Sequence, residues 1–166
     1  GKYVIIYFYP KDDTPGCTKE ACGFRDAFPD FSALNATIVG VSKDTVAKHD
    51  KFKSKYGLPF QLASDEDGSL CEAYGTWVEK SMYGKSYMGI QRATFLIDSS
   101  GTVVETWPKV KVPGHAEAVL ERVQTRRGEL FTEPWVSSVE WRKQQARGAL
   151  HDRVGGDAEE HGGAAQ

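Results

Sequence analysis

Hydrophobic residues occur in this chain as short continuous runs separated by amphipathic and polar stretches. Tyr3–Tyr9 and Ala36–Ser42 are apolar and rich in β-branched or aromatic residues, which predicts strands that are buried on both faces of a mostly parallel sheet. Shorter strand patterns follow at Gln61–Ala63, Gln91–Ile97 and Thr102–Trp107, and the last two flank a hairpin turn at residues 98–101.

Helical patterns lie between these strands. Thr14 is suited to the N-cap of the first helix and Pro15 to its first position. This helix is predicted to run to about Leu34, with a kink or an early end near Phe28 because Pro29 lies inside it. Further helices are predicted at Thr45–Tyr56, closed by Gly57, at Ser69–Tyr74 and at His115–Arg126.

The alternation of strands and helices predicts an α/β domain with a central sheet flanked by helices. We assign this domain to residues 1–124. The regular pattern is lost beyond Gln124, where residues 125–150 are a candidate helical extension and residues 151–166, rich in Gly, Ala and acidic residues, are expected to be disordered. Trp135 and Trp141 make the extension a candidate docking segment.

Composition and charge narrow the function classes. The 166 residues carry a formal net charge of −2 with charges of both signs interspersed, which argues against a nucleic-acid partner. No apolar run approaches the ~18 residues of a membrane span and no signal peptide opens the chain, so we expect no membrane association and a cytoplasmic location. In that compartment three cysteines indicate redox or metal chemistry rather than a disulfide framework.

Cys17 is the candidate nucleophile. It falls three residues past the predicted N-cap, where unpaired backbone N–H groups and the positive end of the helix dipole stabilise a thiolate. The alternative interpretation is a small buried hydrophobic residue, since free cysteine is among the most buried residue types. The cap, Pro15, Gly16 and the second cysteine favour the reactive role.

Cys22 lies five residues further along the same predicted helix. Residues five apart on a helix are rotated by about 140° and their Cα atoms lie about 8–9 Å apart, whereas a disulfide needs about 7 Å or less. Cys17 shares a helical stripe with Ala21, Phe24, Phe28 and Phe31, and Cys22 does not. A bond between the two cysteines would therefore require the first helical turns to unwind.

These motifs resemble a known family. Pro10-x-x-x-Thr14-x-x-Cys17, with Arg92 far downstream, is similar to the active-site signature of the peroxiredoxins, which are thiol peroxidases with a thioredoxin-like fold. The Cys17–Cys22 spacing and the Gly84–Asp98 segment resemble the bacterioferritin comigratory protein, or Q-type, subfamily. The resemblance covers about Lys2 to Val123.

The resemblance implies a thioredoxin-like fold, no cofactor and a set of site roles. Cys17 would attack a hydroperoxide to give a sulfenic acid, Cys22 would resolve it as an intramolecular disulfide, and a dithiol protein such as thioredoxin would reduce that bond. Thr14 and Arg92 would bind the peroxide and stabilise charge, Pro10 would wall the pocket, and Glu20 would support Arg92. We expect a monomer.

Other interpretations remain open at the level of sequence. Thr14 is alternatively only a cap, Pro10 only punctuation, and Arg92 a surface residue at a strand end. A zinc site lacks a second ligand pair near Cys17 and Cys22, and no histidine is near a cysteine in sequence to form a hydrolase dyad. Cys71 is expected to be a buried packing residue.

Two other functions compete with the peroxidase. A thiol–disulfide oxidoreductase of the thioredoxin type would need Cys-x-x-Cys, and a non-catalytic binding module would need no reactive thiol. The latter follows from a departure from the family pattern: the hairpin and short strand that precede this region in family members are lacking upstream of Gly1. Either the sequence is a piece of a longer chain that supplies these elements, or strands left without these partners are exposed sheet edges, which favour association.

Overall fold

The computed structural model of the chain describes residues 1–129. Its elements follow one another as β1 (Tyr3–Phe8), α1 (Pro15–Ala33), β2 (Ala36–Ser42), α2 (Val46–Tyr56), β3 (Gln61–Ser64), α3 (Ser69–Ala73), β4 (Trp77–Met82), β5 (Lys85–Ile90), β6 (Ala93–Ile97), β7 (Val103–Trp107) and α4 (His115–Glu129). Gly1–Val123 forms one compact unit, and of the second unit, which begins at Gln124, only the end of α4 is described. Of the candidate helical extension at 125–150, residues 125–129 belong to α4. The rest of it, with Trp135 and Trp141, and the segment 151–166 lie outside the described residues.

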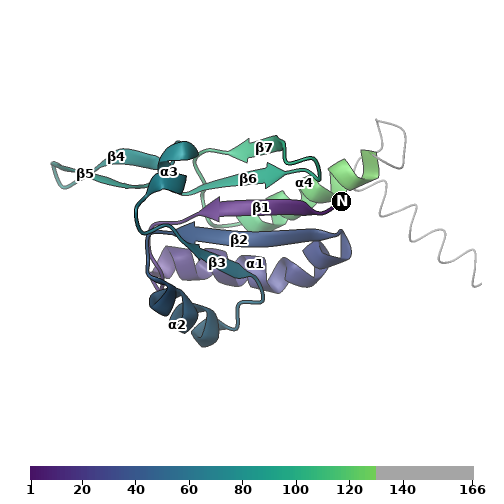
Figure 1. The fold of residues 1–166 in the computed structure, drawn as a ribbon, viewed down its shortest axis with the longest axis horizontal. Coiled ribbons are helices and arrows are strands. Elements are labelled where there is room, and N and C mark those ends of the chain that lie inside the picture. The colour runs from purple at the N-terminus through teal and green to yellow at the C-terminus, as the bar shows by residue number, and fades with distance from the viewer. Residues whose placement is uncertain (130–166) are drawn as a thin grey trace, which may run out of the picture. The chain divides into compact units, whose positions relative to one another are not determined.

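A five-stranded mixed sheet forms the centre of the first unit, with the strand order β3-β2-β1-β6-β7 (Figure 1). β1 pairs in parallel with β2 and antiparallel with β6, so the apolar run that opens the chain lies in the middle of the sheet. β6 and β7 form the hairpin predicted from the turn at residues 98–101. Within residues 1–129, no helix has both the length and the apolar character needed to cross a membrane.

The two faces of β1 pack into two separate cores. Tyr3, Ile5 and Tyr7 join residues of α1 and α4 on one face, whereas Phe8 joins Cys71 of α3 and residues from the end of β5 and from β6 on the other. This arrangement confirms that the strand is buried on both faces, and it explains why its sequence shows no alternation of apolar and polar residues.

α1 continues through Pro29 to Ala33, so the early end expected near Phe28 is wrong. Pro29 lies on the exposed side of the helix, while Phe24 and Phe31 on either side of it are fully buried in the core. Burial of this apolar stripe therefore outweighs the missing N–H of the proline. α4 likewise extends to Glu129, beyond the predicted end at Arg126.

The β4–β5 hairpin, which projects from the end of the sheet in Figure 1, was not predicted. Most of its side chains are exposed, and Tyr83 at its tip reaches 98% exposure. Tyr83 and Gly84 both have positive φ, of 51° and 77°, as a tight hairpin turn requires. Because residues 77–90 pack little apolar surface, they lack the hydrophobic pattern from which strands are predicted. The next strand, β6, begins at Ala93 rather than at the predicted Gln91.

Candidate active site

The loop from Tyr9 to Thr14 delivers Cys17 into the first turn of α1. Thr14 occupies the N-cap position with extended backbone, and Pro15 is the first helical residue, as predicted. The Thr14 side chain makes no capping bond, however; its hydroxyl instead donates to the carbonyl oxygen of Lys11 at 2.9 Å. The sequence therefore predicted the position of the cap but not the hydrogen bond that Thr14 makes.

Cys17 and Arg92 meet at the centre of the site. The Sγ of Cys17, a residue only 2% exposed, accepts a hydrogen bond from Nη2 of Arg92 at 3.3 Å. Nη1 of the same guanidinium donates to Oε1 of Glu20 at 2.9 Å. A Cβ on Gly16 would lie 3.2 Å from Nη2, so glycine at this position leaves room for the arginine. The Arg92 side chain thus lies against Cys17 and Glu20 and is only 15% exposed, unlike a surface arginine at a strand end.

Glu20 and Arg92 form a largely buried ion pair, with side chains that are 1% and 15% exposed. Burial raises the pKa of Glu20 to about 7, against the opposing charge and hydrogen bond of Arg92. Burial alone would lower the pKa of Arg92, but the charges of Glu20 and Cys17 raise it above its usual value. The guanidinium therefore stays charged beside Cys17. Cys17 and Glu20 lie one turn apart on α1, and Arg92, directly before β6, contacts both.

The other predicted site residues differ from Cys17 in how deeply they are buried. Thr14 is half-buried at the start of α1, and Pro10 is exposed at the start of the loop. Cys22 is half-buried on α1, and all three cysteines are free thiols. Cys71 is fully buried, as predicted, and burial together with its hydrogen bond to Asp65 raises the pKa of its thiol to about 12. Cys71 is therefore an unreactive packing residue.

Within residues 1–129, the two buried histidines make their hydrogen bonds to groups other than a cysteine sulfur. His115, at the start of α4, places Nε2 at 2.7 Å from the hydroxyl of Thr94, and burial lowers its pKa to about 4. His49 of α2 bonds instead to Asp12. The hydrogen bonds of the described residues thus pair Cys17 with an arginine rather than with a histidine. His151 and His161 lie outside the described residues.

Two features of the site were missed in the sequence. Asp12, in the loop before Cys17, is buried and bonded to Tyr9, Asp44 and His49. Lys80 of β4 is half-buried near the site, where burial and the charge of Arg92 lower its pKa and Cys17 opposes that change. The acidic pair Asp12-Asp13 directly before the helix was a signal, but two partners of Asp12, Asp44 and His49, lie 32 and 37 residues away in the sequence.

Comparison with known proteins identifies the family of this chain. Residues 1–106 match the AhpC/TSA family. The chain belongs to this family. It is 57% identical to the putative peroxiredoxin Bcp of Coxiella burnetii over 74% of this chain and 82% of that protein, and 52% identical to peroxiredoxin Bcp of Bacillus subtilis over 75% and 79%.

Solved structures give the same result for the fold. The Xanthomonas campestris bacterioferritin comigratory protein, studied for its alkyl peroxide reduction activity, shares 49% sequence identity with this chain at a TM-score of 0.73, covering 76% of this chain and 81% of that one. The expected thioredoxin-like α/β fold, the peroxiredoxin family and its thiol peroxidase chemistry are therefore confirmed. As a peroxiredoxin, the protein takes a peroxide as substrate and a thiol as reductant.

Proposed function

We propose that Cys17 is the residue at which this peroxiredoxin reduces hydroperoxides. The thiolate sulfur attacks the terminal peroxide oxygen, so that an S–O bond forms as the O–O bond breaks. The departing oxygen takes a proton and leaves as water or an alcohol, and Cys17 becomes a sulfenic acid. The observation that carries this proposal is the 3.3 Å contact between Nη2 of Arg92 and Sγ of Cys17, in the first turn of α1.

The neighbouring groups fit the charge changes of this displacement. Arg92 stabilises the thiolate before attack and the negative charge that develops on the departing oxygen. Glu20 holds the guanidinium in that orientation through its 2.9 Å bond. The Thr14 hydroxyl donates its hydrogen bond to the carbonyl oxygen of Lys11, so its lone pairs can accept a hydrogen bond from a bound hydroperoxide. Pro10 is exposed, and by its place in the family motif we expect it to wall the pocket.

We further propose that Cys22 resolves the sulfenic acid. Both cysteines lie on α1, where helix geometry separates Cα atoms five residues apart by about 8–9 Å. A disulfide between them therefore requires the first turns of the helix to unwind, which also carries Cys17 out of its buried position. The resulting bond would be reduced by a dithiol protein of the thioredoxin type through a mixed disulfide. Such reductants place the protein in a reducing compartment such as the cytoplasm, where we expect it to act as a monomer.

Intact-mass measurement after one equivalent of hydrogen peroxide tests this scheme. The native chain is expected to lose two hydrogen atoms, as the disulfide forms. Cys22→Ser should instead gain one oxygen atom at Cys17 and fail to recycle with thioredoxin, and Cys17→Ser should not react. Cys71→Ser is the matched control, because that thiol is buried away from the site. Full recycling by Cys22→Ser would refute the resolving role, and an unreactive native chain would refute the peroxidase itself.

A further inference from the structure

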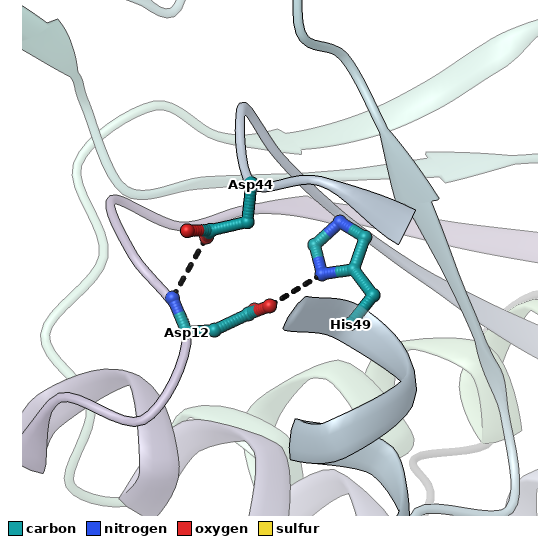
Figure 2. A group of neighbouring side chains, drawn as sticks. All are labelled: Asp12, Asp44 and His49. Atoms are coloured by element: carbon teal, nitrogen blue, oxygen red, sulfur yellow. Dashed lines mark hydrogen bonds and ion pairs between the residues drawn. The ribbon is translucent and has the colours of Figure 1, made fainter. Parts of the chain in front are cut away.

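A buried polar network binds the loop of residues 9–14, which precedes Cys17, through the side chain of Asp12. Asp12 lies in this loop and is 9% exposed, and His49 of α2 is 3% exposed. Nδ1 of His49 lies 2.6 Å from Oδ2 of Asp12, and the hydroxyl of Tyr9 donates to Oδ1 at 2.5 Å. Figure 2 shows the Asp12 carboxylate pointing at the imidazole of His49, with Asp44 above the Asp12 backbone.

The partners of the imidazole determine its charge. Nδ1 opposes the Asp12 carboxylate, and Nε2 opposes the carbonyl oxygen of Ala63 on β3 at 3.1 Å. A carbonyl oxygen only accepts hydrogen bonds, so Nε2 must carry a proton. The proton shared with Asp12 belongs on the histidine, because a carboxyl is ordinarily the stronger acid. Both ring nitrogens are therefore protonated, and His49 is a buried imidazolium.

We propose that His49 is a positioning residue of the peroxidase site: as a buried imidazolium it joins Asp12 of the active-site loop to the β3 backbone and so fixes Thr14 relative to Cys17. This inference rests on the proposed function of Cys17. We call Tyr9, Asp12, His49 and the carbonyl of Ala63 the loop anchor. Loss of one proton removes one of the two His49 bonds, because the deprotonated nitrogen then faces an acceptor.

The link from the anchor to the reaction runs through the loop backbone. The N–H of Asp12 donates to Asp44 at 2.8 Å, and the next residue but one, Thr14, is tied back to Lys11. Asp13 has a positive φ of 57°, a conformation uncommon for residues other than glycine, and Lys55 and Tyr56 of α2 bond its carboxylate. Movement of Asp12 would therefore be transmitted to Thr14, whose oxygen the reaction uses.

The charged surroundings of His49 agree with this assignment. Burial of the ring lowers its pKa, but the bond to Asp12, the charge of Asp12, the Ala63 carbonyl and the charge of Asp44 together raise the pKa above its usual value. The groups facing the ring are Tyr9 at the end of β1, Asp12 in the loop, Asp44 after β2 and Ala63 in β3. On α2 itself, the neighbouring Lys48 and Asp50 are exposed.

A metal ion is the competing explanation for this cluster, since ligand atoms of Asp12, Asp44 and His49 lie within 4.8 Å of one another. The hydrogen bonds argue against it. Each nitrogen of His49 already faces an acceptor oxygen, each oxygen of Asp12 has a hydrogen-bond partner, and Oδ2 of Asp44 accepts from the hydroxyl of Ser42 at 2.6 Å. A histidine ligand must be neutral, with a free lone pair.

Two measurements on the full chain test the proposal. In the first, nitrogen-15 NMR of the imidazole rings should show both His49 nitrogens protonated at neutral pH and a pKa above the usual value, whereas His115 serves as an internal neutral histidine. Asp50→Asn, an exposed neighbour on α2, should leave the His49 titration unchanged. A neutral His49 at pH 7, or His49 resonances that shift on addition of Zn²⁺ alone, would overturn the proposal.

In the second measurement, the rate of Cys17 oxidation by hydrogen peroxide is followed from about pH 6 to about pH 9, across the histidine range. The native rate should fall as pH rises through the pKa of His49. His49→Asn keeps a donor towards Asp12 without a titrating ring, and it should retain the neutral-pH rate while losing this fall. His49→Leu should be slower at every pH by about tenfold or more, since ~1 Å of misplacement can cost ~100-fold.

The double variant Asp12→Ala/His49→Leu guards against a simple folding defect, because replacing a buried charged pair with apolar residues is often tolerated. It should fold, react slowly and show no fall at high pH. If it or His49→Leu reacts at the native rate, the anchor does not position the site. If Cys17 of the native chain is oxidised and these variants react at the same rate, the proposed function of Cys17 stands and only the positioning role of His49 is refuted.

Discussion

The Arg92 side chain contacts two groups of one helix at once, and this double contact is the main residue-scale feature of the site. One nitrogen lies 3.3 Å from the Cys17 sulfur and another 2.9 Å from Glu20, one helical turn further on. The planar guanidinium can serve both partners because its donors are fixed in a fork, which a lysine ammonium does not provide.

Replacing this arginine should remove both thiolate stabilisation and stabilisation of the departing oxygen. We expect Arg92→Gln to slow oxidation of Cys17 by hydrogen peroxide by about 100-fold or more, the usual effect of losing one preorganised donor, as measured by stopped-flow fluorescence. Arg122→Gln is the control, because Arg122 of α4 pairs with Glu105 of β7 rather than with Cys17 or Glu20. Equal rates in the two variants would contradict the role of Arg92.

Glu20 should make stability depend on pH. Its pKa is raised from 4.5 to about 7, so between these values the folded chain holds a proton that the unfolded chain has released. Stability from this group is therefore present at low pH and decreases as pH rises through about 7. Urea unfolding of Glu20→Gln at about pH 5 and about pH 7.5 should show a smaller decrease than the native chain. An equal or steeper decrease would contradict this assignment.

At the scale of elements, α1 has to satisfy two demands, because it must present Cys17 at one end and bury its aromatic stripe along its length. Its residues Cys17, Ala21, Phe24 and Phe31 are buried on one face, whereas Pro29 is exposed. The helix therefore keeps a proline that contributes no packing and prevents one backbone hydrogen bond.

Removing this proline should stabilise the chain. Pro29→Ala restores the missing donor within the helix, and we expect the free energy of unfolding to increase by about 1–3 kcal/mol, up to the full propensity difference between the two residues. Pro59→Ala is the matched control, since Pro59 lies in the loop between α2 and β3. There the larger entropy of the unfolded chain should decrease stability by about 0.4–1 kcal/mol. Urea unfolding measures both, and destabilisation by Pro29→Ala would contradict the argument.

At the scale of the whole molecule, the described domain depends on aromatic residues that join separate elements. Phe24 of α1 is fully buried and stacks on Tyr7 of β1 with ring centroids 4.8 Å apart, and it meets His115 of α4 edge-on at 5.8 Å. One side chain thus connects the active-site helix, the central strand and the last helix.

Truncating this side chain should weaken the domain as a unit. We expect Phe24→Ala to lower the free energy of unfolding by about 3–5 kcal/mol, because a large buried cavity is left. Phe28, one turn further on and only half-buried, is the comparison, and Phe28→Ala should cost clearly less. Equal losses in thermal or urea unfolding would show that α1 is not held chiefly through Phe24.

The sequence by itself determined the central strands, the start of α1 and the buried face of α1, because interactions between near neighbours in the chain decide these features. The continuous apolar runs predicted β1 and β2, the Thr14-Pro15 pair predicted the start of α1, and the spacing of Cys17, Ala21 and Phe24 predicted its buried face. Cap preferences, proline geometry and helical periodicity act over a few residues, so they can be read without knowing the fold.

Only the tertiary structure decided the features that join distant residues. It placed Arg92 against Cys17 across 75 positions and His49 against Asp12 across 37, and it carried α1 through Pro29 because Phe24 and Phe31 are buried there. The exposed β4–β5 hairpin likewise escaped prediction, since its strands bury little apolar surface. Such contacts depend on which strands lie side by side, and a long-range pairing leaves no local pattern in the chain.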